Sequence, residues 1–113
     1  MSRVREAFPE IQSIEDDDLR SGVVEAWETA MADTDVENLH EVPWFPPAQH
    51  ELGVDDEWLV PHVRDVTACA VGLAETLVER RDADVSLDTV VAGALVHDVS
   101  KLYEFDGMDE TAV

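Results

Sequence analysis

Basic residues are scarce in this sequence of 113 residues, which contains 7 lysines and arginines against 27 aspartates and glutamates. Lys101 is its single lysine, and the formal net charge at pH 7 is −20. A surface of this sign repels phosphate backbones and anionic lipids. The composition therefore disfavours generic binding to nucleic-acid backbones and to membrane surfaces.

Cysteine and long apolar runs are scarce as well. Cys69 stands alone, which excludes an internal disulfide, and we expect it to pack as a small apolar residue. The longest uncharged apolar stretches, Val66–Ala74 and Thr89–Val96, are too short to span a membrane. The opening "MSRVREAFPEIQ" contains no apolar run typical of a signal peptide. We therefore expect a soluble, cytoplasmic protein.

The acidic residues are spread along the whole chain, often beside apolar ones, and 45% of the residues are hydrophobic. This mixture favours a packed domain over an acidic disordered protein. An acidic coat with almost no lysine resembles the composition of proteins from salt-in halophiles, where high salt screens the self-repulsion. The alternative is an ordinary acidic protein.

The first half of the sequence predicts one helix and a long loop. The helix runs from Ile14 to about Met31, with Ser13 as its N-cap and Trp27 in the core. Residues 33–53 read as a loop, because "VPWFPPAQ" contains adjacent prolines that cannot lie inside a helix. The aromatic pair Trp44 and Phe45 could cover the core or wall a pocket, and we favour the covering role.

The second half predicts a pair of helices. One runs from about Asp56 to Arg81, although Pro61 suits a first turn and the helix proper then starts near Val60. The other runs from Leu87 to about Tyr103. No segment alternates with period two, so the sequence predicts an all-α bundle with about three main helices. We predict one partial domain with a helix in 1–34, a loop in 35–55 and the helix pair in 56–105.

Four polar side chains of the helix pair form a chemical constellation: His62, His97, Asp98 and Lys101. Imidazole and carboxylate groups together suit Fe, Mn, Co, Ni or Zn. A charge within the apolar run "GALVHDVSKL" is costly unless it is compensated, and a metal ion would compensate it. His-Glu dipeptides also occur at 40–41 and 50–51, so a coincidental His-Asp pair stays an alternative.

The spacing of these residues sets a geometric condition. His62 lies 18 residues before Arg80, and His97 lies 10 residues after Leu87. At about 1.5 Å per residue, a strict antiparallel hairpin would leave the two histidines about 12 Å out of register. The connector must therefore run back along the pair, or the helices must cross steeply, if His62 and His97 are to meet.

The motif "HVRDVTACAVGLAE", followed about twenty residues later by "AGALVHDVSKL", resembles the HD-domain metal-dependent phosphohydrolases. That family carries a histidine near the start of one helix and a His-Asp pair on the next, often as "LLHDIGK". The chain departs from this form at Val99 and Ser100, and its composition would make it an archaeal, halophile-like member. The resemblance implies a helical bundle of the HD-domain type.

The resemblance also implies roles for individual residues. His62, His97 and Asp98 would bind a divalent metal ion (Mn, Fe, Co, Ni, Zn or Mg), and Asp98 would bridge two ions in a binuclear site. Asp98 and Lys101 would be catalytic, with Lys101 contacting a substrate phosphate. The family's last motif aspartate lies on a later helix, and neither Asp106 nor Asp109 matches it. We therefore expect the chain to be a fragment, truncated before that aspartate.

Three hypotheses of function follow. The first is a metal-dependent phosphohydrolase that cleaves a nucleotide or related phosphoester with metal-activated water. The second is a non-catalytic HD-like helical module that binds a nucleotide or a protein. The third is an acidic helical interaction domain in which His97-Asp98 is a coincidence. Exposed apolar faces would also permit a homo-oligomer.

Overall fold

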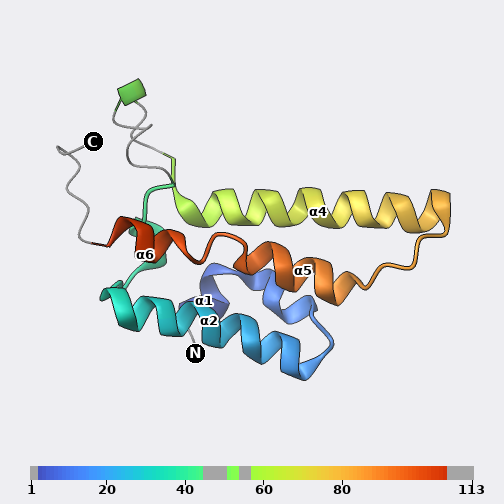
Figure 1. Ribbon diagram of the computed structural model, residues 1–113, viewed down its shortest axis with the longest axis horizontal. Coiled ribbons are helices and arrows are strands. Elements are labelled where there is room, and N and C mark those ends of the chain that lie inside the picture. Colours follow the sequence, from blue (N-terminus) through green and yellow to red (C-terminus); the bar gives the residue numbers. More distant parts are fainter. Residues whose placement is uncertain (1–2, 45–50, 54–56, 107–113) are drawn as a thin grey trace.

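The computed structural model describes residues 3–44, 51–53 and 57–106. This part of the chain is helical and contains no strand, which confirms the all-α prediction. The helices pack as a bundle in which α5 and α6 lie between α4 on one side and α2 on the other (Figure 1). The elements in chain order are α1 (Arg3–Ala7), η1 (Pro9–Ser13), α2 (Asp17–Thr34), η2 (Leu39–Glu41), α4 (Leu59–Arg81), α5 (Leu87–Val96) and α6 (Lys101–Phe105).

The start of α2 differs from the predicted start at Ile14. The N-cap is Asp16, whose carboxylate accepts a hydrogen bond of 3.0 Å from the backbone N–H of Leu19. Ser13 ends the short helix η1 instead, and its hydroxyl donates to the carbonyl of Glu10. Ser13 and Asp16 are both residue types that cap helices. In the structure Asp16 caps α2, while Ser13 bonds within η1.

Asp88 ties the start of α2 to the first turn of α5. Its two carboxylate oxygens accept the backbone N–H groups of Glu15 and Asp16 at 3.0 and 2.9 Å. Charge-assisted hydrogen bonds of this kind are stronger than neutral ones. This contact joins two segments that are far apart in sequence and fixes the position of the α5 N-terminus next to the start of α2.

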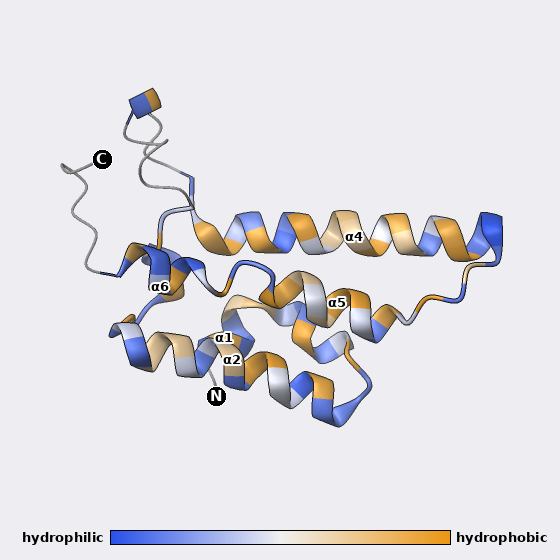
Figure 2. Cartoon of the chain, viewed as in Figure 1, coloured by the Kyte–Doolittle hydropathy of each residue, from blue (hydrophilic) through white to orange (hydrophobic). Residues whose placement is uncertain are grey.

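The core forms around Trp27, which is fully buried as predicted. Its indole N–H donates to the carbonyl of Leu95 on α5 at 2.9 Å, and its ring lies 5.0 Å from that of Phe8. Figure 2 shows mostly hydrophobic residues along α5, the helix that lies between the other two long ones. The buried residues of α5 are Val91, Ala92 and Leu95, and the helix contacts both α4 and α2.

Helix α4 is much longer than the helix that follows it. It begins at Leu59, with Pro61 in its first turn as predicted, and spans 23 residues or about 34 Å. Helix α5 has 10 residues and is only about 15 Å long. The connector 82–86 runs back along α4 before α5 begins (Figure 1). This path is the first of the two solutions that the spacing of His62 and His97 allowed.

The predicted helix from Leu87 to Tyr103 is interrupted, because α5 ends at Val96 and α6 begins only at Lys101. In an uninterrupted helix the carbonyl of Ala94 would accept from the N–H of Asp98. Here it accepts both the backbone N–H and the imidazole Nδ1–H of His97, at 3.4 and 2.6 Å. From His97 to Lys101 the backbone bonds join residues three positions apart, as in His97 to Ala94, Val99 to Val96 and Lys101 to Asp98. The His-Asp pair therefore lies in a turn.

The outer face of α4 is exposed, which makes the prediction for Cys69 wrong. Cys69 is exposed, and Leu73 nearby has 63% of its surface accessible. The bundle covers α4 on one side only, so Val63, Thr67 and Ala74 are its buried positions beyond the first turn.

Among the described helices, none is long and apolar enough to cross a membrane.

Tyr103 links α6 to α2, because its hydroxyl donates a hydrogen bond of 2.7 Å to Asp33. This hydrogen bond raises the pKa of Tyr103 above its ordinary value of 10.0, and desolvation and the negative charge of Asp33 act in the same direction. A raised pKa in the folded state means that the bond stabilises the fold below pH 10. That stabilisation is lost as the pH rises through the raised pKa.

Tyr103 is the only tyrosine, so its titration can be followed by tyrosinate absorbance without overlap from another phenol. We expect it to titrate above pH 10.0 in the folded protein, and the Asp33→Asn variant should titrate closer to 10.0. Urea-unfolded protein provides the reference. A folded-state titration at or below the unfolded one would contradict the Tyr103–Asp33 contact.

Candidate metal centre

Three predicted ligands converge at one end of the α4–α5 pair. His62 lies in the first turns of α4, while His97 and Asp98 occupy the turn that follows α5. Their possible ligand atoms all lie within 4.8 Å of one another, and they form a group of metal-ligating type in the part of the chain that the structure describes. Residues separated by 35 positions thus come together because the connector returns along α4.

Asp98 is the centre of this group. Its Oδ2 atom lies 2.9 Å from Nε2 of His62 and 3.0 Å from Nε2 of His97. The Asp98 side chain is only 16% exposed. Its backbone carbonyl accepts the N–H of Lys101 at 3.0 Å, which holds the turn in place at the start of α6.

His97 is oriented by a hydrogen bond to the main chain. Its Nδ1 lies 2.6 Å from the carbonyl oxygen of Ala94, which can only accept, so Nδ1 carries the proton and donates. The opposite nitrogen, Nε2, faces Asp98. Metal-ligating histidines commonly use one nitrogen for such a bond and the other for the metal. This contact at the end of α5 therefore orients the imidazole of His97.

The donor set fits a divalent transition metal. Two imidazoles and one carboxylate suit Fe, Mn, Co, Ni or Zn, whereas Mg prefers oxygen ligands. Two donors of one ion lie at most about 4.4 Å apart when each bond is about 2.0–2.2 Å long. The spread of up to 4.8 Å in His62, His97 and Asp98 is close to that limit. Small side-chain rotations would suffice to bring all three onto one ion.

Lys101, the predicted phosphate contact, lies one turn beyond Asp98. Its ammonium is 3.6 Å from a carboxylate oxygen of Glu104 and 5.7 Å from the centre of the Phe105 ring. The Lys101 side chain is only 19% exposed. A contact between Lys101 and a substrate phosphate stays a prediction.

Trp44 lies at the site, where sequence reasoning had favoured a position over the core. Its indole stacks on the imidazole of His62, with ring centres 4.7 Å apart and an angle of 26° between the planes. In the sequence, the prolines on either side of Trp44 and Phe45 marked this aromatic pair as notable. They did not indicate which residue either ring would contact. Phe45 lies outside the described residues.

Two of the other polar residues considered from the sequence lie among the described residues. His40 is exposed on η2, and Asp106 is exposed just after α6. His50 and Asp109 lie outside the described residues. Neither His40 nor Asp106 belongs to the group of His62, His97 and Asp98.

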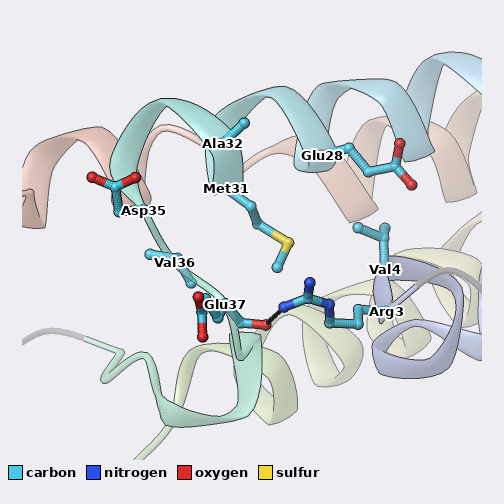
Figure 3. A pocket seen from close by; sticks show the side chains of 8 residues that line it. All are labelled: Arg3, Val4, Glu28, Met31, Ala32, Asp35, Val36 and Glu37. Carbon is cyan, nitrogen blue, oxygen red and sulfur yellow. Dashed lines mark hydrogen bonds between the residues drawn. The ribbon is translucent and has the colours of Figure 1, made fainter.

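A pocket of about 480 Å³ lies elsewhere, between α1 and the end of α2. Figure 3 shows three carboxylates around it, from Glu28, Asp35 and Glu37, together with Arg3. The guanidinium of Arg3 donates to the backbone carbonyl of Glu37. None of the lining residues belongs to the group of His62, His97 and Asp98.

Comparison with known proteins gives one informative similarity. The chain is 30% identical over 100 residues to a dihydroneopterin 2',3'-cyclic phosphate phosphodiesterase of Methanocaldococcus jannaschii, an alignment that covers 83% of the chain and 39% of the relative. No protein-family model and no solved structure matches the chain. The chain is thus a distant relative of a phosphodiesterase, and it spans about two fifths of the length of that enzyme.

Proposed function

We propose that the chain carries the metal-binding part of a metal-dependent phosphoester hydrolase. The convergence of His62, His97 and Asp98 within 4.8 Å is the observation that carries this proposal. The similarity to a phosphodiesterase and the resemblance to the HD-domain phosphohydrolases support the same reaction type. A divalent ion in such a site polarises a phosphoryl oxygen and makes hydroxide available near neutral pH.

The side chains of the site would have separate roles in metal binding and in substrate binding. The two imidazoles and the Asp98 carboxylate would bind the ion, with His97 held in the productive orientation by the Ala94 carbonyl. Lys101 would approach the substrate phosphate as a point charge by exchanging its contact with Glu104 for one with the phosphate. The low exposure of Asp98 limits the water that competes for these groups.

For the substrate, we propose a small phosphodiester attached to a nucleotide-like heterocycle. The relative acts, by its name, on a 2',3'-cyclic phosphate. A free dianionic monoester would bring more negative charge to a chain of net charge −20 than a diester monoanion does. The electrostatic balance thus agrees with a diester.

The direct test is a hydrolysis screen of metal-free protein in molar KCl with added Mn, Co, Ni, Zn or Mg. The salt screens the repulsion between the acidic residues. We expect metal-dependent cleavage of bis(p-nitrophenyl) phosphate and of a 2',3'-cyclic nucleotide, faster than cleavage of p-nitrophenyl phosphate. The transition metals should exceed Mg. Two variants are compared: His97→Ala removes a proposed metal ligand, and His40→Ala removes an exposed histidine outside the group. The comparison shows whether loss of activity is specific to the site.

The outcomes distinguish the hypotheses. Metal-dependent hydrolysis that is lost in His97→Ala and kept in His40→Ala supports the enzyme. Metal binding without turnover of any phosphoester favours the non-catalytic module, which the three-ligand group in the described residues also permits. If calorimetry detects no bound transition metal at millimolar concentration, the proposal is wrong.

A further inference from the structure

Trp44 is held in place by the main chain. Its backbone N–H donates to the carbonyl of Glu57 at 3.2 Å, and the N–H of Leu59 donates to the carbonyl of Val42 at 2.9 Å. Pro43 and Trp58 form an antiparallel bridge between these two bonds. The segment before the loop is thereby fixed to the residues that lead into α4. These bonds place the main chain of Trp44 beside the start of α4.

The indole restricts the ring of His62. The two rings stack at 4.7 Å with nearly parallel planes, and the imidazole of His97 lies at 5.9 Å from that of His62. The His62 side chain is 26% exposed, so it would otherwise have room to turn toward solvent. Trp44 occupies part of that room and fixes the imidazole plane.

The two histidines of the site therefore depend on different supports. His97 is oriented through Nδ1 by the carbonyl of Ala94. Within the described part of the chain, the hydrogen bond of the His62 ring is the one between Nε2 and Asp98, with none from Nδ1. A histidine that binds metal usually has its other nitrogen fixed by a second group. For His62 the neighbouring group is the indole of Trp44, which stacks on the face of the imidazole.

We infer that Trp44 is a positioning residue of the centre: its indole holds the His62 imidazole in the orientation that points Nε2 at Asp98. The inference rests on the proposed function only in taking His62, His97 and Asp98 as metal ligands. The orientation of His62 itself is a property of the metal-free protein. Loss of a group that orients a ligand lowers metal affinity by roughly 10- to 100-fold.

Three variants test this role. Trp44→Leu removes the aromatic face and keeps an apolar side chain, Trp44→Phe keeps a ring, and Trp58→Leu is the matched control. Trp44 and Trp58 are exposed to nearly the same extent, 38% and 39%, and Trp58 pairs in the bridge with Pro43, the residue before Trp44. Among the described residues, Trp44 is the one of the two that stacks on His62.

The first measurement is the affinity for Mn²⁺ and Co²⁺ by calorimetry in molar KCl. We expect Trp44→Leu to bind each ion about 10-fold more weakly, with Trp44→Phe close to the wild type and Trp58→Leu unchanged. Thermal unfolding of each variant shows whether the fold is retained. Equal metal affinity of Trp44→Leu and the wild type would overturn the inference, as would an equal loss in Trp58→Leu.

The second measurement uses metal-free protein and nuclear magnetic resonance of the imidazole groups. Removal of the indole should shift the carbon-bound ring protons of His62, which lie over the aromatic face, and should leave those of His40 in place. Trp44→Phe should restore much of the shift. If wild-type protein binds no metal, the proposed function fails, while this experiment still decides whether Trp44 orients His62. An unchanged His62 signal in Trp44→Leu would refute the orientation.

Discussion

Replacing Asp98 by asparagine should lower the affinity for divalent transition metals by about 100-fold or more and remove metal-dependent hydrolysis. Altering a group that only supports a ligand lowers metal affinity by about 10- to 100-fold. Asp98 is itself a proposed ligand, so we expect a larger loss. Its Oδ2 lies within 3.0 Å of Nε2 of both His62 and His97, so this one atom contacts both imidazoles. The amide has almost the same shape but lacks the negative charge that offsets the charge of the ion.

Calorimetry with Mn²⁺ and Co²⁺ checks this expectation, together with the hydrolysis assay. Asp84→Asn is a suitable control, because Asp84 is exposed in the connector and its substitution changes the net charge by the same amount. The control should bind metal as the wild type does. Retention of wild-type affinity in Asp98→Asn would mean that the ion is bound elsewhere, and the proposed centre would be wrong.

The second large effect concerns stability. Replacing Trp27 by alanine should lower the free energy of unfolding by about 3–5 kcal/mol, because a fully buried aromatic side chain leaves a cavity. The loss of its N–H also leaves the Leu95 carbonyl without this partner, at a cost of about 1–3 kcal/mol. Small domains have about 5–15 kcal/mol in total. The variant should therefore be close to unfolded.

Trp27→Phe tests a smaller change, because it keeps one six-membered aromatic ring while it removes the N–H donor and part of the buried volume. Urea unfolding followed by circular dichroism should place it about 1–3 kcal/mol below the wild type, between the wild type and Trp27→Ala. The exposed Trp58→Phe should change stability by less than about 0.5 kcal/mol. A Trp27→Ala protein as stable as the wild type would contradict the packing around α5.

The sequence allowed good prediction where local rules decide the outcome. Pro61 marks a first helical turn, so the start of α4 near Val60 follows from the geometry of proline. The buried position of Trp27 follows from its place in the apolar stripe. The constellation of His62, His97 and Asp98 was recognisable because the family resemblance supplied the pairing that spacing alone left open.

Prediction failed where a side chain acts on the main chain or where distant segments pair. At the end of α5 the imidazole of His97 bonds to the Ala94 carbonyl, a contact that helical periodicity does not reveal. The place of Trp44 depends on backbone hydrogen bonds between residues 42–44 and 57–59, across the whole intervening loop. The helix α1 is too short to show a periodic pattern. The division into a partial domain and the oligomeric state stay predictions.

The termination of α5 at Val96 has an electrostatic consequence. The aligned peptide dipoles of a helix place partial negative charge at its carboxyl end, where a carboxylate is disfavoured by about 0.3–1 kcal/mol. Asp98 lies two residues beyond that end, so the helix field opposes its charge in the absence of a cation. The same field attracts a cation. A divalent ion held by Asp98 and the two imidazoles would therefore be stabilised by the dipole of α5 as well as by its ligands.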